Sequence, residues 1–383
     1  MKRNCNLNSS EMTILHVLTL DGNSGIYGGP SQVAQNLSRA LNKKSYQTKI
    51  LSGSINQENT ENLKDNDFER VKVKSLVKSQ PITSLFSFGI LISLIRNIRN
   101  RDVIHIHFGR ELIPLTAAVI CIILRKKFIL QTHGMIKPDK RYSIRILDYF
   151  LIRHLIRMAY RVLALTPDES NSISKFSGSN IELLPNGINF DSVKDVSVIK
   201  SQRVIFCSRI NKRKRPEFFV DAAIELQEEF PGIKFEIYGP NGGWLDQLEK
   251  HLKNRNFNLS DFYFGPLSHS EVQKKIAESL VTVLPSFGEP FPMVILESLA
   301  VGTPVLVMPS CQISEIIHKI DQNFVAAEES VKGVVETLRL QLIKLIKDPN
   351  HFETKNKSIP FFSEDIVTNK LISIYKSLES EIC

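Results

Sequence analysis

Short apolar runs alternate with longer amphipathic stretches along the whole chain. In the first half, five short runs have the composition of buried strands, at 13–20, 48–51, 103–107, 128–132 and 162–166. Between them lie stretches with helical periodicity, for example 31–41, 112–124 and 143–160. Alternation of apolar strands with helices is typical of parallel sheets that helices cover on both faces. The pattern therefore predicts an α/β protein.

The second half repeats this alternation, which predicts a second parallel sheet. Its strand-like runs lie at 203–207, 234–238, 261–264, 281–284 and 304–307. We expect a first domain at 1–188, a linker at 189–202 and a second domain at 203–360, because a Pro-Asn-Gly turn ends the first sheet. The amphipathic tail predicts a C-terminal helix at 361–383, which could cross back to the first domain.

Length and composition agree with two globular domains. The chain has 383 residues, 42% of them hydrophobic, and a domain typically has about 100–200 residues. The longest apolar run, 112–124, is shorter than the roughly 20 residues of a membrane-spanning helix. The first ten residues lack the apolar core of a secretory signal, and the five cysteines form no C-x-x-C pair. These features predict a cytoplasmic protein without disulfide bonds or a zinc site.

The charge of the chain is unevenly distributed. Residues 1–185 contain 26 basic and 14 acidic residues, a net charge of +12, whereas the remainder has a net charge of −3, which together give the total of +9. A basic half attracts anionic partners such as lipid headgroups, phosphorylated acceptors or nucleic acid. A solvated basic surface without a partner explains the asymmetry equally well.

In open parallel sheets, ligands bind beyond the carboxyl ends of the strands. After the first strand comes a glycine-rich loop that ends in Gly28 and Gly29 and leads into a helix. Backbone without side chains at a helix N-terminus lets a phosphate or a sugar approach the amides. A flexible loop without a ligand is an equally good interpretation of these glycines.

A histidine follows the strand at 128–132. His133 lies beside Gly134 at the expected end of this strand, where its ring can project into a cleft as a hydrogen-bond donor or proton carrier. His105 and His107 lie within the neighbouring strand, so a structural role is the better prediction for them.

A basic loop follows the strand at 203–207. Five of the seven residues from Arg209 to Arg215 are basic, directly before a helix. Position and charge together predict an anion-binding site. A nucleic-acid-binding run is the alternative, which the place inside a βα turn disfavours. After the next strand, Gly239 opens another loop that a ligand could approach closely.

The segment 283–305 is the most informative part of the chain. Glu289 lies in the loop after a strand, and Glu297 lies one turn inside the helix that begins near Met293. Two carboxylates in this arrangement can bind different hydroxyl groups of one ligand. The amides of Phe291, Met293 and Val294 at the helix start would face an anionic group.

In this order, these segments resemble the retaining glycosyltransferases of family 4, which have the GT-B fold of two facing Rossmann-like domains with parallel sheets. The resemblance rests on five short segments spread over nearly the whole chain: Gly28-Gly29, DVIHIH with QTHG, Pro185-Asn186-Gly187-Ile188, SRINKRK, and the E-x7-E block PSFGEPFPMVILESLAVGTPV.

The resemblance implies a nucleotide-sugar site in the second domain and an acceptor site in the first. Arg209 and Lys214 would bind the donor diphosphate, Glu297 the ribose hydroxyls and Glu289 the donor sugar. His133 would act at the reacting centre from the first domain. The family needs no metal ion, so we expect no cofactor other than a UDP- or GDP-linked donor substrate.

We therefore expect a retaining glycosyltransferase that acts on a saccharide acceptor, lipid-linked in our first interpretation, in the synthesis of a surface polysaccharide or glycolipid. A GT-B synthase that acts on a small soluble sugar is the second interpretation. A basic membrane- or nucleic-acid-binding module with a vestigial sugar-nucleotide site is the third. The intact set of Arg209, Lys214, Glu289 and Glu297 argues against the third, and we expect no nucleic-acid partner.

The helix expected at 143–162 suggests attachment to the inner face of the plasma membrane. One stripe is apolar and should pack on the sheet: Ile144, Leu147, Leu151, Leu155, Met158 and Val162. The opposite side alternates arginines with apolar residues, and we expect Arg145, Phe150, Arg153, Arg157 and Arg161 to face the membrane, with Ile146, Ile152 and Ile156 between them. Cover by another part of the protein or by a second subunit is the alternative.

Overall fold

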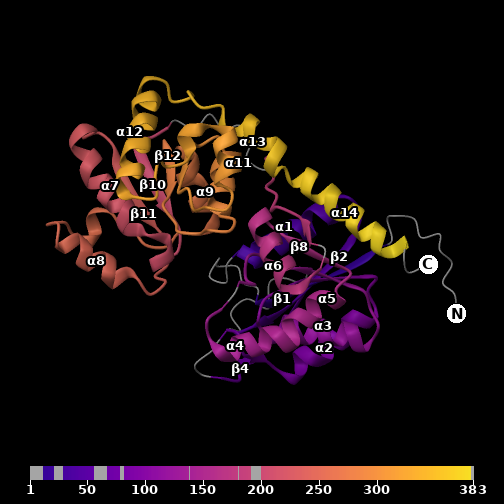
Figure 1. Ribbon diagram of the computed structural model, residues 1–383. Coiled ribbons are helices and arrows are strands. Elements are labelled where there is room, and N and C mark those ends of the chain that lie inside the picture. Colours follow the sequence, from indigo (N-terminus) through magenta and orange to yellow (C-terminus); the bar gives the residue numbers. More distant parts are fainter. Residues whose placement is uncertain are drawn as a thin grey trace. The chain divides into compact units, whose positions relative to one another are not determined.

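The computed structural model describes residues 12–20, 29–55, 67–77, 82–137, 139–179, 181–190 and 200–380. The chain divides into two compact units (Figure 1). The N-terminal unit comprises Met1–Gly187 and Glu364–Cys383, and the C-terminal unit comprises Ile188–Ser363. Each unit has its own parallel sheet between helices, so the predicted α/β class with two Rossmann-like regions is confirmed.

The N-terminal unit is built on a seven-stranded parallel sheet in the order β3-β2-β1-β6-β7-β8-β9. Its strands are β1 (Thr13–Leu20), β2 (Gln47–Ser54), β3 (Phe68–Lys72), β6 (Val103–His107), β7 (Phe128–Gln131), β8 (Arg161–Ala164) and β9 (Ile181–Leu183). A two-stranded antiparallel sheet is formed by β4 (Lys74–Ser75) and β5 (Leu85–Phe86). Every residue of β6 and β7 is buried, because helices cover both faces of a parallel sheet.

The helices of this unit are α1 (Gly29–Lys43), α2 (Phe88–Arg99), α3 (Leu112–Ile123), α4 (Tyr142–Leu147), the π-helical segment η1 (Asp148–Ile152), α5 (Arg153–Met158), α6 (Pro167–Ser177) and α14 (Glu364–Ser380). The C-terminal helix α14 packs against α1, and α2 packs against α3. Tyr375 anchors α14, because its hydroxyl lies 2.6 Å from Nδ1 of His105 on β6.

The C-terminal unit has a four-stranded parallel sheet in the order β11-β10-β12-β13. The strands are β10 (Arg203–Cys207), β11 (Lys234–Tyr238), β12 (Val281–Leu284) and β13 (Val305–Val307). The helices are α7 (Pro216–Glu229), α8 (Leu245–Lys253), α9 (His269–Glu278), α10 (Met293–Ala300), α11 (Ser314–Ile320), α12 (Val331–Lys347) and α13 (Thr354–Phe362), and the 3₁₀ turns are η2 (Lys212–Lys214), η3 (Leu259–Asp261) and η4 (Gln322–Phe324). The strand expected at 261–264 is wrong, because only an isolated bridge between Tyr263 and Ile237 forms there.

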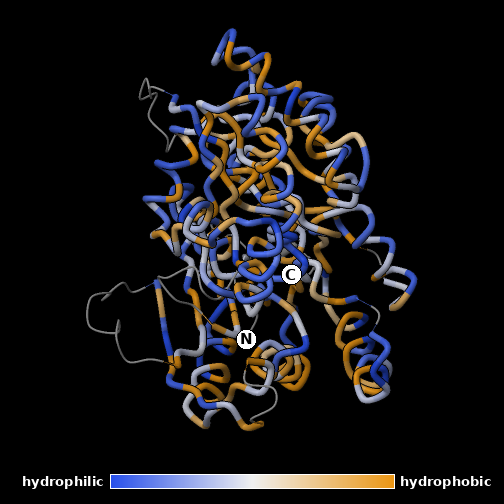
Figure 2. The backbone as a smooth tube through the Cα atoms, turned by 90° about the vertical axis from the view of Figure 1, so that its left-hand side faces the viewer, coloured by the Kyte–Doolittle hydropathy of each residue, from blue (hydrophilic) through white to orange (hydrophobic). Residues whose placement is uncertain are grey.

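Hydrophobic stretches run through the interior of the units, and hydrophilic stretches are more frequent in the outer loops and helices (Figure 2). None of the helices that the structure describes combines the length and the apolar character that crossing a bilayer requires.

A row of buried histidines crosses the middle of the N-terminal sheet. His16 on β1 lies directly opposite His105 on β6 in the strand register. The Nδ1 atom of His16 lies 3.2 Å from Nε2 of His107, and Nδ1 of His107 lies 2.7 Å from Nε2 of His133. The rings of His107 and His133 are stacked, with centroids 4.9 Å apart. The row therefore links the interior of the sheet to its carboxyl edge.

These imidazoles are neutral in the folded protein. Burial lowers the pKa of His16 and of His133 to about 3. Burial, followed by repulsion from the neighbouring imidazoles, lowers the pKa of His105 and of His107 well below the ordinary value. A neutral imidazole has one N–H donor and one acceptor nitrogen, so neighbouring rings can share a hydrogen bond without charge.

We predict that the histidine row makes folding stability fall as the pH decreases below about 6.5. An unfolded chain binds protons there that the native imidazoles do not accept, which destabilises the fold by up to about 1.4 kcal/mol per pH unit for each histidine. Urea unfolding at pH 7.5 and at pH 5.5 measures this dependence. His16→Phe should reduce it, and His154→Gln on the exposed surface should not.

The informative quantity is the difference between the wild type and His16→Phe in the pH dependence of the free energy of unfolding. Burial raises the pKa of Glu297 to about 7, and a raised carboxyl pKa stabilises the fold as the pH falls, in the opposite direction to the histidines. An NMR titration in which any of the four imidazoles protonates near pH 6.5 would contradict the prediction.

Candidate functional site

The carboxyl edge of the C-terminal sheet brings three loops together. In the loop after β10, the amide of Ile210 donates to the carbonyl of Pro240 at 2.9 Å, and the carbonyl of Ile210 accepts from the amide of Gly242 at 2.8 Å. Pro240 and Gly242 lie in the loop after β11. The amide of Phe287, after β12, donates to the carbonyl of Arg213 at 2.8 Å. Backbone hydrogen bonds therefore hold the basic loop between the other two loops.

Two glycines allow this close approach. A Cβ on Gly239, which has a φ of +148°, would lie 1.9 Å from the carbonyl oxygen of Ser208. A Cβ on Gly242 would lie 2.6 Å from Cγ of Arg209. The carbonyl of Ser208 thus packs directly against Gly239, which a side chain at this position would prevent. Gly242 lets the Arg209 side chain lie across the loop.

Glu289 binds two cations of the basic loop. Its Oε2 atom lies 2.9 Å from Nζ of Lys214 and 3.3 Å from a guanidinium nitrogen of Arg213. The backbone carbonyl of Glu289 accepts from the amide of Gln312 at 2.9 Å. Burial lowers the pKa of Lys214, and the adjacent Glu289 carboxylate opposes this shift. Two cations on one carboxylate leave an excess positive charge at the sheet edge.

The other cations of the loop lie against different partners. Arg215 forms an ion pair with Glu329 at 2.5 Å, and its guanidinium lies 4.6 Å from the centroid of the Phe287 ring. Lys212 lies 5.6 Å from the Trp244 ring centroid. The basic run is therefore not a uniform anion-binding patch, and the excess charge is concentrated at Arg213 and Lys214.

Glu297 lies in the middle of α10, and its side chain is 11% exposed. Burial raises its pKa to about 7. The basic group recorded next to it among the described residues is the imidazole of His269, whose Nδ1 atom lies 3.8 Å from the carboxylate. Near neutral pH this carboxyl exchanges between its neutral and charged forms, so it can donate or accept hydrogen bonds with ligand hydroxyls.

The start of α10 is fixed by apolar packing. Phe291 is buried, and its ring meets Phe362 edge-on at 6.0 Å between centroids. Val294 packs against the cluster that contains Ile205, Cys207 and other core residues. Of the three positions singled out in the sequence, Phe291 and Val294 thus have structural side chains, and together with Met293 they can offer a ligand only backbone groups.

His133 lies at the carboxyl edge of the N-terminal sheet, in a turn with an unusual backbone. His133 has a φ of +51° and Gly134 a φ of +71°. The buried carboxylate of Glu169 accepts hydrogen bonds from the Gly134 amide, from Oγ1 of Thr132 at 2.5 Å and from the Leu165 amide at 2.8 Å. This carboxylate holds a left-handed conformation that a non-glycine residue rarely adopts.

Sequence reasoning did not find Glu169. The available signal was the helix start at Thr166-Pro167, where Oγ1 of Thr166 accepts from the Glu169 amide at 3.2 Å. An acidic residue in the first turn of a helix is ordinary, so its contact with the distant turn could not be recognised.

Gly28 and Gly29 of the predicted site lie where the described part of the chain resumes after β1. Gly28 lies outside the described residues. Gly29 begins α1, and a Cβ there would meet no atom within 4 Å. Among the described residues, no group of three or more metal-ligating side chains could hold a metal ion.

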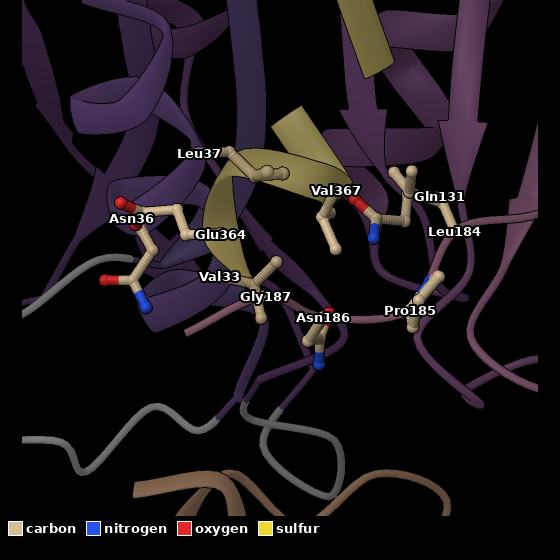
Figure 3. A pocket seen from close by; sticks show the side chains of 10 residues that line it. All are labelled: Val33, Asn36, Leu37, Gln131, Leu184, Pro185, Asn186, Gly187, Glu364 and Val367. Atoms are coloured by element: carbon tan, nitrogen blue, oxygen red, sulfur yellow. The ribbon is translucent and has the colours of Figure 1, made fainter. Parts of the chain in front are cut away.

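A small cavity lies in the N-terminal unit where α1, α14 and the segment after β9 meet (Figure 3). Gln131, Asn186 and Glu364 bring polar groups to it, and Val33, Leu37 and Val367 bring apolar ones. Its volume of about 10 Å³ is the size that one water molecule requires. This cavity is therefore too small for a sugar.

The helix after β7 differs from the expected regular helix. It runs from 142 to 158 in three parts, with η1 in the middle. A π-helical turn inserts an extra residue and rotates the rest of the helix about its axis. Ile152 and Ile156, expected beside the arginines on the outer face, are fully buried, whereas Met158, expected inside, is 50% exposed. The prediction is therefore wrong at Ile152, Ile156 and Met158, whereas Leu155 and Val162 are buried as expected.

The five residues predicted to face a membrane do not share one face. Arg145 and Phe150 are exposed. Arg153 is half-buried with its guanidinium 5.9 Å from the Tyr149 ring, and Nε of Arg157 donates to the Ser177 carbonyl at 2.7 Å. Arg161 is not helical at all, because it begins β8.

Two family profiles match consecutive parts of the chain. The profile described as Glycosyltransferase Family 4 matches residues 27–192, and the profile described as Glycosyl transferases group 1 matches residues 189–358.

Curated relatives carry glycosyltransferase names. The D-inositol 3-phosphate glycosyltransferase of Paenarthrobacter aurescens is 26% identical over 232 residues, which are 54% of this chain and 55% of the relative. The chain thus spans about half the length of this relative. The putative glycosyltransferase EpsF of Bacillus subtilis is 26% identical over 345 residues, 82% of each chain.

Solved structures share the fold over the whole chain. Anabaena HepE in complex with UDP has a TM-score of 0.71 and 15% identity, and the match covers 96% of this chain and 100% of HepE. Sucrose-phosphate synthase of Thermosynechococcus elongatus has a TM-score of 0.70 and 13% identity, with 97% and 100% covered. Because the two profiles together match residues 27–358, this chain belongs to the group 1 and family 4 glycosyltransferases, which have the GT-B fold.

Proposed function

We propose that this glycosyltransferase takes a sugar from a UDP- or GDP-linked donor and transfers it to a saccharide acceptor with retention of configuration and without a metal ion. The observation that carries the proposal is the excess positive charge that Glu289 holds at Lys214 and Arg213. Departure of a nucleoside diphosphate concentrates negative charge, and preorganised cations stabilise that charge best.

Each polar group of the C-terminal edge has a task in this proposal. Lys214 and Arg209 bind the diphosphate, and Glu297 binds the ribose hydroxyls. Glu289 positions the cations and accepts hydrogen bonds from the donor sugar. Support for a uridine nucleotide comes from HepE, whose solved complexes contain UDP and UDP-glucose. His133 is proposed as the sugar-binding contribution of the N-terminal unit.

The acceptor is proposed to be a lipid-linked saccharide, in the synthesis of a surface polysaccharide or glycolipid on the inner face of the plasma membrane. The basic N-terminal half and the exposed aromatic residues Tyr149 and Phe150 support this choice. A phosphorylated soluble polyol is the second candidate, because several curated relatives are named D-inositol 3-phosphate glycosyltransferases.

A thermal-shift screen of UDP, GDP, ADP and their sugar derivatives tests donor binding. The matching nucleotide at about 100 times its Kd should stabilise the fold by about 2.7 kcal/mol. Lys214→Ala should abolish the shift, and Lys212→Ala, which alters the same loop beside Trp244, should retain it. If none of the nucleotides raises the melting temperature, the proposed donor site is wrong.

Transfer kinetics test the roles of the cations. Arg209→Ala and Lys214→Ala should each lower kcat by about 10²–10³, because each removes charge stabilisation at the leaving group. Arg213→Ala should also lower kcat, because Arg213 is the second cation that Glu289 holds at this edge. Unchanged turnover in both Arg209→Ala and Lys214→Ala would refute the assignment.

Co-sedimentation with anionic vesicles tests membrane attachment. We expect binding at low salt that weakens at high salt, and we expect the double variant Tyr149→Ser, Phe150→Ser to lose it. The matched control is Phe88→Ser with Ile92→Ser, which removes equally exposed apolar side chains from α2. Absence of binding at low salt, or equal losses in both double variants, would contradict attachment through the 142–158 helix.

A further inference from the structure

A large apolar cavity lies in the N-terminal unit, between the 142–158 helix and α6, beside the segment that follows β7. Its volume is about 500 Å³, which is within the usual range of small-molecule sites. Ile146, Phe150, Ile173 and Phe176 contribute apolar walls. None of the residues proposed to bind the donor lines this cavity.

A hydrogen-bonded ion pair forms the floor of the cavity. Arg110 forms a two-pronged ion pair with Asp148 at 2.7 and 2.8 Å. The same guanidinium donates to the carbonyls of Met135 at 3.2 Å and Lys137 at 2.7 Å. Arg110 therefore ties the first residue of the π turn to the segment that leaves His133, and its own charge is satisfied by Asp148.

The outer wall exposes aromatic rings. Tyr142, Tyr149 and Phe150 are 76%, 62% and 72% exposed. Large apolar side chains gathered around a cavity mark a site for an apolar ligand. Tyr149 and Phe150 are consecutive residues of the π turn, and their rings meet edge-on with centroids 5.0 Å apart.

The rim carries positive charge. Asp139 forms an ion pair with Arg141 at 2.6 Å, and Asp148 forms an ion pair with Arg110. Both acidic side chains of the lining are therefore compensated by a positive charge. Lys137 and Arg145 also line the cavity and are exposed, and no ion pair is recorded for either among the described residues. An anionic group would complement this rim.

We propose that the cavity binds the hydrocarbon chain of a lipid phosphate, with the phosphate at Lys137 and Arg145. An apolar cavity with cations on one side matches a linear amphiphile with a single anionic end. Lys137 lies four residues after His133 in the same segment, so the anionic end is held close to the proposed sugar-binding turn. The inference rests on the proposed function in one respect, that this lipid carries the acceptor saccharide.

Dodecyl phosphate, kept below its micelle concentration, is a suitable probe for the full chain, with binding measured by calorimetry. In the series from octyl to dodecyl phosphate, each added methylene should tighten binding about fourfold, from about 0.8 kcal/mol per buried CH₂, until the cavity is full. Inorganic phosphate alone should not bind measurably, and dodecyltrimethylammonium should bind at least tenfold more weakly than dodecyl phosphate.

Variants distinguish binding of the lipid inside the cavity from adsorption to the surrounding surface. Ser172→Trp fills the cavity and adds apolar surface, so it should weaken binding of dodecyl phosphate at least tenfold. Ile146→Asp, which places a charge in the wall, should do the same if the first variant fails to fold. Lys137→Gln combined with Arg145→Gln should weaken binding about tenfold, whereas Lys175→Gln, on the exposed side of α6, should leave it unchanged.

Two outcomes would overturn the inference. If Ser172→Trp and Ile146→Asp both melt like the wild type and bind dodecyl phosphate unchanged, the lipid adsorbs to the surface and does not enter the cavity. If inorganic phosphate competes fully with dodecyl phosphate, the site is an anion site without a chain-binding function. Neither result affects the nucleotide-induced thermal shift, so failure here is distinguishable from failure of the proposed donor site.

Discussion

The ion cluster around Glu289 is the interaction on which the polar chemistry of the C-terminal unit depends. One nearly buried carboxylate holds Lys214 at 2.9 Å and Arg213 at 3.3 Å. Breaking a buried pair by removal of one partner costs about 3–5 kcal/mol, because the other charge stays buried without compensation. The cations are therefore held in place without a ligand, and this is the property that the proposed stabilisation of an anionic leaving group requires. Such local geometry can outweigh the net negative charge of the second half of the chain.

The buried carboxylates Glu169 and Glu297, one in each unit, differ in their surroundings. Glu169 accepts from two amides and a hydroxyl, and these hydrogen bonds fix the turn at His133. Glu297 has its pKa raised to about 7 by burial, and the Nδ1 atom of the His269 imidazole lies 3.8 Å from its carboxylate. The proposed role of Glu297 in binding ligand hydroxyls rests on this burial and on its place one turn inside α10.

The sequence was sufficient for the parts of the fold that follow from local periodicity, such as the central strands and the E-x7-E segment at a strand end. The sequence was insufficient where a single inserted or unpaired residue changes the geometry of a helix or strand. The helical stripe assumed a constant rotation per residue, and the π turn at Asp148–Ile152 shifted Ile152 and Ile156 into the core. The expected strand at 261–264 has the right composition, but it pairs with β11 at a single residue, Tyr263. The partners of Arg213 and Arg215 are distant in sequence, so no pattern near the basic loop could assign one to Glu289 and the other to Glu329.

The ligands proposed for the two units differ in kind, and this difference follows from what the described part of each unit contains. The C-terminal edge has ionic groups held by backbone hydrogen bonds between loops, which suits a compact, highly charged ligand. The N-terminal unit has a neutral imidazole at its sheet edge and a largely apolar cavity whose acidic groups are paired, which suits a ligand whose charge is small relative to its apolar surface. Arg110 connects these features, because it binds Asp148 under the cavity and the carbonyls of the segment that follows His133. If the proposed apolar chain displaces Asp148, we therefore expect the displacement to reach the segment that follows His133 through Arg110 and these two carbonyls.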